Sequence, residues 1–279
     1  MTETDVRHLA AQAIRILASS AGSPTKSSEE ERRALDQHAQ ELHKAILSDS
    51  KAVERKTMAH FRRDGLTAAH IVDEVIPAVA RRLGWEWADD TLSFAEVSLA
   101  SARLQEMVRA LAARSSPFAD DAQQILQSQP GSLPKILLII PRPEQHTLGT
   151  FVAADQLRRF GYDVHVSVDQ HPNQVALNVR KQRYVMVGIT VAGRRSLASA
   201  RELVDKIRTS NTRATPIILG GSLTDTDLPL KQMTGVDYVA QDVQSALEMC
   251  GLDMVEADPS LGLMAGHANI VERATGDGD

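Results

Sequence analysis

Glu144, His146 and Gly149 form the pattern in this sequence with the clearest chemistry. They lie in the segment PRPEQHTLGT, directly after the apolar run KILLII. A neutral imidazole can bind a transition metal, and a carboxylate two residues earlier can accept the other ring N–H, which fixes the tautomer. Gly149 has no Cβ, so a large ligand can approach the backbone there. The pattern predicts a metal site with one histidine ligand; the alternative is a polar loop whose histidine bonds to a backbone group.

The composition also favours histidine as the metal ligand. Among 279 residues there are nine histidines and one cysteine, Cys250, which cannot by itself form an internal disulfide, a CxxC pair or a thiolate zinc cage. The other eight histidines share no spacing, and we interpret them as surface residues. The sequence offers no catalytic residue, so we do not expect an enzyme.

Charge and hydropathy limit the classes of partner that this protein is expected to bind. The net charge is -5, which argues against a dedicated nucleic-acid binder. Five arginine pairs, among them Arg62-Arg63, would indicate an auxiliary contact with DNA only if they clustered. The N-terminus lacks a signal pattern and no apolar run could cross a bilayer, so a cytoplasmic protein without a membrane partner is expected.

Two further loops carry small residues at predicted strand ends. Thr190 and Gly193 follow one strand, and Gly220, Gly221 and Ser222 follow the next. Ligands of parallel sheets bind outside the carboxyl ends of the strands. Together with Thr147, at the expected start of the helix after His146, these residues indicate a groove kept open for an elongated ligand.

The elements that must position these loops alternate along residues 135–254. Strands are predicted at 135–140, 162–168, 184–190, 216–219 and 237–239, and helices at 150–160, 174–182, 196–208 and 243–249. This alternation predicts an α/β fold with a doubly wound, flavodoxin-like parallel sheet.

Residues 1–115 have helical periodicity throughout. Helices are predicted at 6–20, as one long pattern at 29–63, after the capping residue Thr67 with a kink at Pro77, and after the capping box of Ser93 and Glu96. We therefore expect a helical N-terminal region with a four-helix-type cap at 1–115, a linker at 116–134 and a flexible tail at 255–279.

These motifs together resemble a known superfamily. Glu144-x-His146-x-x-Gly149, then Thr190-Val191-Ala192, then Gly220-Gly221 is similar to the DxHxxG, SxL and GG signature of cobalamin-binding domains. The helical cap, with LGWEWADDTLSFAEVSLASARLQ, most resembles the AerR/PpaA family of photosynthesis antirepressors.

The resemblance implies a role for each residue. His146 would be the lower axial ligand of cobalt and Glu144 its partner. The groove for the nucleotide tail would be lined by Thr147, Gly149, Thr190, Gly193, Gly220, Gly221 and Ser222. Trp87, Phe94 and Val97 would cover the upper face of the corrin; the alternative for the aromatics is core packing.

One departure bears on the cofactor form. Light sensors that use adenosylcobalamin carry a Trp, nine residues and then Glu-His in the cap, whereas here those two positions, counted from Trp87, are Val97 and Ser98. The resemblance thus favours hydroxo- or aquocobalamin, with the adenosyl and methyl forms as alternatives and haem as a different ligand for the same histidine.

The resemblance also implies a function. A regulator of this family would act through a PpsR/CrtJ-type repressor and would relieve repression of photosynthesis genes in response to light or cofactor supply, touching DNA only indirectly or as an auxiliary contact. The alternative is a corrinoid protein that carries methyl groups between methyltransferases.

Overall fold

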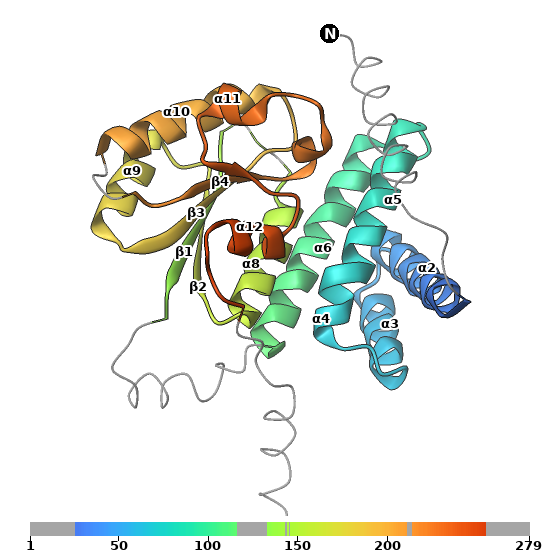
Figure 1. Cartoon of the computed structure of the whole chain (residues 1–279). Coiled ribbons are helices and arrows are strands. Elements are labelled where there is room, and N and C mark those ends of the chain that lie inside the picture. The colour runs from blue at the N-terminus through green and yellow to red at the C-terminus, as the bar shows by residue number, and fades with distance from the viewer. Residues whose placement is uncertain (1–25, 116–132, 143, 145, 211–213, 255–279) are drawn as a thin grey trace, which may run out of the picture.

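The computed structural model describes residues 26–115, 133–142, 144, 146–210 and 214–254. Within this part, a bundle of helices precedes a parallel sheet that has helices on both faces (Figure 1). The helix expected at 6–20, most of the expected linker and the expected tail lie outside the described residues.

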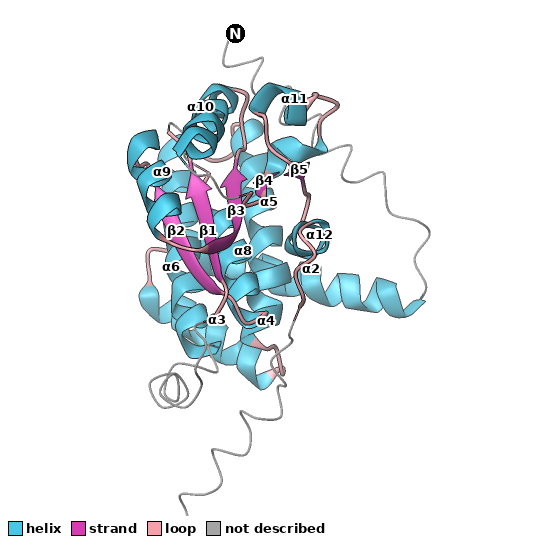
Figure 2. Cartoon of the chain, turned by 60° about the vertical axis from the view of Figure 1, so that its left-hand side comes forward, coloured by secondary structure: helices cyan, strands magenta, loops and turns pink. Residues whose placement is uncertain are grey.

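The sheet has the doubly wound topology that the sequence predicts. Its five strands are all parallel and follow the order β2-β1-β3-β4-β5 (Figure 2). They are β1 (Lys135–Ile140), β2 (Asp163–Val168), β3 (Tyr184–Thr190), β4 (Ile217–Gly220) and β5 (Tyr238–Val239). The strand order reverses direction between β1 and β3, and ligands of such sheets bind at this switch point.

Helices cover both faces because β1 is apolar on both sides. Leu137 and Ile139 of β1 pack against α9 (Pro172–Lys181) and α10 (Arg195–Ser210). Ile136 and Leu138 pack on the other face, against α8 (Leu148–Arg159) and α12 (Val243–Met249). Two short helices were not predicted from the sequence: the 3-10 helix η2 (Ser222–Asp225) and α11 (Leu230–Thr234).

The cap consists of α2 (Lys26–Leu47), α3 (Lys51–Arg63), α4 (Ala68–His70), the π-helix η1 (Ile71–Val75), α5 (Ile76–Ala88) and α6 (Phe94–Ser115). The prediction of one helical pattern over 29–63 was wrong, since the chain leaves the helix at residues 48–50. The Arg103 guanidinium donates to the carbonyl oxygens of Ile46 and Ser48, both at 2.7 Å. Carbonyl groups at the end of α2 therefore have hydrogen-bond partners although the helix does not continue.

Pro77 changes the helix type at the point where a kink was expected. The proline lies in the first turn of α5, and the π-helical turn η1 comes directly before it. Since a proline ring clashes with the carbonyl four residues earlier, the wider π turn accommodates it. Both predicted caps are confirmed: Thr67 accepts from the His70 N–H, and Ser93 and Glu96 form reciprocal bonds.

Cap and sheet domain meet along α8, which lies beside α6 (Figure 1). The Val152 side chain belongs to the apolar core of the cap, together with the half-buried Leu148 and Phe151. At the far end of α8, Asp73 of η1 accepts hydrogen bonds from Gln156 at 3.0 Å and Arg159 at 2.6 Å. None of the helices in the described residues is long and apolar enough to span a membrane.

Candidate cobalt-binding site

Glu144 and His146 are joined by two hydrogen bonds at the carboxyl end of β1. The Oε1 atom of Glu144 lies 2.8 Å from His146 Nδ1 and also accepts the His146 backbone N–H at 3.0 Å. The loop between the strand and α8 is therefore folded by the carboxylate itself, which fixes the imidazole relative to the sheet.

The second oxygen of Glu144 connects this loop to the neighbouring strand. Oε2 accepts the backbone N–H of Ala192 and the hydroxyl of Ser196, both at 2.9 Å. Burial alone would raise the pKa of Glu144, whose side chain is 4% exposed, but the hydrogen bonds from His146, Ala192 and Ser196 outweigh burial and lower the pKa to about 2. Glu144 is thus a carboxylate at neutral pH.

This ionisation state determines the tautomer of His146. A carboxylate can only accept, so Nδ1 of His146 carries a hydrogen and donates it, which leaves the lone pair of the neutral ring on Nε2. The hydrogen bond to the Glu144 carboxylate raises the pKa of His146 above its usual value of 6.5. The His146 side chain is 77% exposed, so Nε2 can reach a metal outside the protein surface.

The residues after His146 combine a contact to the cap with an open backbone. The Thr147 hydroxyl does not cap α8 but accepts a 2.6 Å hydrogen bond from Gln105 of α6. A Cβ added to Gly149, in the first turn of α8, would meet no atom within 4 Å. The loop therefore touches the cap on one side and leaves free space on the other.

Thr190 lies at the expected strand end, but its hydroxyl is already engaged. It lies 2.8 Å from the hydroxyl of Thr150, a buried residue of α8, and 3.3 Å from the Ile139 carbonyl oxygen. These contacts connect β1, β3 and α8 below the loop. A Cβ on Gly193, by contrast, would meet open space.

Gly220 is the last residue of β4 and Gly221 and Ser222 follow it, and Gly221 has a structural reason to be glycine. Its φ is +105°, and a Cβ there would lie 2.3 Å from the Val191 carbonyl oxygen. A Cβ on Gly220 would meet only the Ala240 carbonyl oxygen, at 3.8 Å, and Ser222 is exposed. Gly221 thus lets the loops after β3 and β4 lie in contact.

The cap residues named from the sequence differ in exposure. Trp87 and Val97 are half-buried, whereas Phe94 is 68% exposed. At about 100° per residue, Phe94 lies on the same face of α6 as Gln105, which contacts Thr147. Phe94 is eleven residues before Gln105, about 16 Å along the helix. As the first residue of α6, Phe94 therefore lies about three helical turns from the contact with the loop.

Three residues of this region were not predicted from the sequence, namely Gln105, Thr150 and Ser196, and neither was the backbone contact of Ala192, a position already named in the motif. Thr150 and Ser196 are hydroxyl residues at helix starts, which is a common position with no special signal, whereas Gln105 and Ala192 act through contacts distant in sequence. The description of the remaining histidines as surface residues was wrong for His43, which is buried with Nε2 2.6 Å from Glu86 Oε2.

In the described part of the chain, no three His, Cys, Asp or Glu side chains group into a metal cage. A metal held at His146 must therefore take its other ligands from elsewhere. A corrin ring would supply four nitrogens to cobalt and leave room for an imidazole, so the exposed His146 side chain, with Nε2 free of the bond to Glu144, and the open space at Gly149 and Gly193 fit cobalamin.

Comparison with known proteins agrees with this chemistry. Residues 134–250 match the B12 binding domain family. The chain is 30% identical over 189 residues to an uncharacterized 20.5 kDa protein in the bchF-crtJ intergenic region of Rhodobacter capsulatus, covering 64% of this chain and 92% of that protein. It is 26% identical over 166 residues to ethylmalonyl-CoA mutase from Methylorubrum extorquens, covering 57% of this chain but 22% of the mutase.

The architecture of cap and sheet domain is also shared with a solved structure. The monomethylamine corrinoid protein of Methanosarcina barkeri superposes with a TM-score of 0.61 at 14% identity, covering 77% of this chain and 99% of that one. With the Rhodobacter relative covered almost completely and the B12 binding domain matched, this chain belongs to the cobalamin-binding superfamily, with its B12-binding domain at residues 134–250.

Proposed function

We propose that this protein is a cobalamin-binding regulator that relieves transcriptional repression of photosynthesis genes by binding a PpsR/CrtJ-type repressor. The relative that is 30% identical is named for its position in the bchF-crtJ intergenic region, and this supports a role at such a locus. The proposal that the protein binds cobalamin rests on one observation. The buried carboxylate of Glu144 holds Nδ1 of His146, and the rest of this exposed side chain is free to bind a metal.

In this proposal His146 holds cobalt from below, and Glu144 keeps its ring oriented. Gly149 and Gly193 leave room for the cofactor beside the loop, and Phe94 faces it from the cap. When bound, cobalamin would supply a cobalt ion with an exchangeable upper ligand, in the hydroxo or aquo form. The chain's own contribution is to position the ligand and to enclose it between cap and sheet domain.

The regulatory step lies in the contact between α6 and the loop. The bond between Gln105 and Thr147 joins the cap to the residue next to His146. A cofactor held at His146 would favour one arrangement of α6 relative to the loop. A repressor that binds this arrangement more tightly than the arrangement of the cofactor-free protein would then respond to the cofactor. The switch can be no larger than the difference in cobalamin affinity between the two arrangements.

The direct test measures repressor binding by the full chain, empty and loaded with hydroxocobalamin. The proposal expects different affinities in the two states, and the difference should vanish for His146→Ala under the same conditions. Equal repressor binding by the empty and loaded wild-type protein would exclude the switch.

A second experiment tests the cofactor. The protein is mixed with hydroxo-, methyl- or adenosylcobalamin or with haem, free ligand is removed, and spectra are recorded in darkness and in light. Retention of hydroxocobalamin supports the proposal. Retention of haem alone contradicts it, and methyl transfer to and from the bound corrinoid would instead indicate a methyl carrier.

A further inference from the structure

Helix α3 presents a basic face that the proposed cofactor site does not use. Arg55, Lys56, Arg62 and Arg63 are all exposed on this helix, and within the described ranges none of them pairs with an acidic side chain. Arg55 and Arg62 are seven residues apart, as are Lys56 and Arg63, so the four form two parallel rows along the helix. The local positive charge contrasts with the net charge of -5.

The acidic groups near this face have other side-chain partners in the structure. Asp49, just before α3, binds Arg103 at 2.9 Å, and Asp64, just after it, lies 3.3 Å from His60. Glu54, the acidic residue of α3 itself, is buried and bonds to Lys51 at 3.0 Å. In the described residues, none of these three carboxylates forms an ion pair with the two basic rows.

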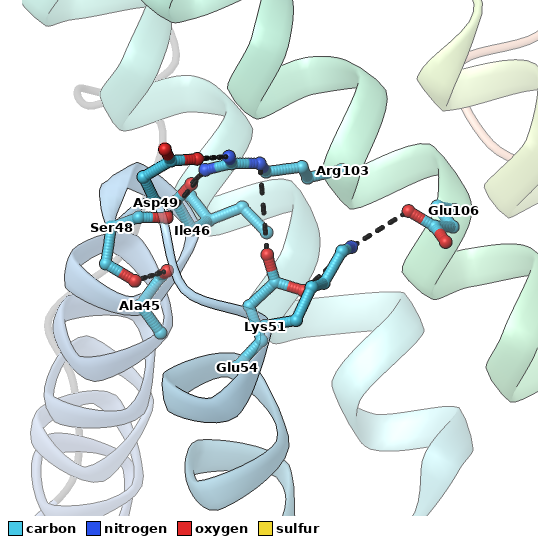
Figure 3. Close-up of polar contacts among 8 residues, drawn as sticks. All are labelled: Ala45, Ile46, Ser48, Asp49, Lys51, Glu54, Arg103 and Glu106. Atoms are coloured by element: carbon cyan, nitrogen blue, oxygen red, sulfur yellow. Dashed lines mark hydrogen bonds and ion pairs between the residues drawn. The ribbon is translucent and has the colours of Figure 1, made fainter.

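The start of α3 is fixed to the rest of the cap, as Figure 3 shows. Arg103 of α6 joins the carbonyl oxygens at the end of α2 to Asp49, and Lys51 bridges Glu54 and Glu106. The Lys51 ammonium donates to both carboxylates, and these hydrogen bonds raise the pKa of Lys51, with the bond to Glu106 the larger cause. The basic rows thus stand on a helix anchored at its N-terminal end rather than on a loop.

We propose that this face of α3 binds the phosphate backbone of duplex DNA. The helix is 13 residues or about 20 Å long, and duplex DNA carries one negative charge per about 1.7 Å of its axis, so several phosphates lie within reach of the rows. A protein partner fits less well, because the core of a protein interface is depleted of charge and rich in aromatic residues. On the exposed face of α3 the large apolar side chain is Val53, which is 42% exposed.

This inference goes beyond the proposed function, because its test requires neither a repressor nor cobalamin. The full chain is titrated into a fluorescently labelled 20-base-pair duplex of arbitrary sequence, and anisotropy is recorded over a series of KCl concentrations. Four phosphate contacts predict that the logarithm of the binding constant falls against the logarithm of salt with a slope of about -3.6.

The variant R55Q/K56Q/R62Q/R63Q is expected to bind the duplex more than tenfold more weakly, with a slope near zero. The matched control R81Q/R180Q/K181Q/R183Q removes the same charge from exposed positions outside α3 and should bind like wild type. Circular dichroism melting of both variants checks that they fold.

The proposal is overturned if the wild-type protein does not bind the duplex at 50 mM KCl. That result is expected if the basic face of α3 binds an acidic protein instead of DNA. It is also overturned if the control loses as much affinity as the α3 variant, since binding would then follow net charge or another surface. Failure of either kind would leave the cobalamin and repressor tests unaffected.

Discussion

The Nδ1 atom of His146 lies 2.8 Å from Oε1 of Glu144, while the other oxygen of the same carboxylate lies 2.9 Å from the Ala192 backbone nitrogen. One buried side chain thus orients the imidazole at the end of β1 and attaches its loop to the end of β3. In the proposed site, this fixed orientation of the His146 imidazole would lower the cost of ordering the metal ligand.

Replacing Glu144 with Gln should lower the pKa of His146. The hydrogen bond to the Glu144 carboxylate is the largest cause that raises this pKa, and a neutral amide removes the negative charge that stabilises the protonated ring. An NMR titration of the His146 ring in the empty protein measures the effect. Ser196→Ala is the control, because it removes one bond to Glu144 but keeps the carboxylate, so the pKa should stay above 6.5.

The same titration predicts how cobalt ligation depends on pH. A proton and a metal compete for Nε2 of His146, so ligation weakens as the pH falls, and a raised pKa makes the competition begin at a higher pH than for an ordinary histidine. As the pH falls, the visible spectrum of cobalamin ligated by His146 should disappear. In the Glu144→Gln protein the midpoint of this change should lie at a lower pH than in the wild type. An unchanged midpoint would show that the carboxylate does not control this histidine.

Two glycines of the site should respond differently to alanine. Gly221→Ala places a Cβ 2.3 Å from the Val191 carbonyl oxygen at a φ of +105°, so a loss of stability of about 2 kcal/mol or more is expected. Gly149→Ala meets no atom within 4 Å and improves helix propensity, so its melting temperature should stay equal or rise. If Gly149 lies against the cofactor, the second variant should nevertheless bind cobalamin more weakly.

Local patterns were sufficient to predict the sheet domain and the strand ends that carry the candidate site. The apolar run of β1 and the loops after β1, β3 and β4 could be identified because strand burial and strand ends are properties of short segments. Glu144 and His146 are two residues apart, so their interaction was also visible in the sequence.

What the sequence did not reveal depends on contacts between distant residues. The end of α2 at Leu47 is stabilised by Arg103, 55 residues after Ser48, and His43 is buried because it meets Glu86, 43 residues later. Within the site, Ser196 binds Glu144 across 52 residues. Helical periodicity at 29–63 contains no information about these partners, so the long pattern could not be divided correctly.

Arg159 should be more important for stability than Asp73, its partner across the contact between cap and sheet domain. Arg159 donates to Asp73 at 2.6 Å and to the buried Asp155 at 3.0 Å. Arg159→Ala leaves the Asp155 carboxylate buried without a cation, which should cost about 2 to 4 kcal/mol, whereas Asp73→Asn keeps an acceptor and should cost less. Urea unfolding at pH 7 compares the two.

The pH dependence of the Arg159→Ala protein provides a second measurement. Burial already raises the pKa of Asp155 above 3.8, and loss of the guanidinium should raise it further. The folded state then binds more protons than the unfolded state, so stability falls as pH rises through this range and recovers as pH falls toward the raised pKa. A deficit in stability that is independent of pH would mean that lost packing, not the charge of Asp155, causes it.

Phe94 and Leu99 allow a matched test of the cap, because both are exposed apolar residues of α6, at 68% and 52%. Phe94 shares the face of Gln105, whereas Leu99 points about 120° away from it. Alanine at either position should leave the melting temperature of the empty protein within about 2 °C of wild type, because little buried surface is lost. Phe94→Ala should speed the dissociation of bound cobalamin and alter its visible spectrum, while Leu99→Ala should do neither. Equal dissociation rates for the two variants would show that Phe94 does not cover the cofactor.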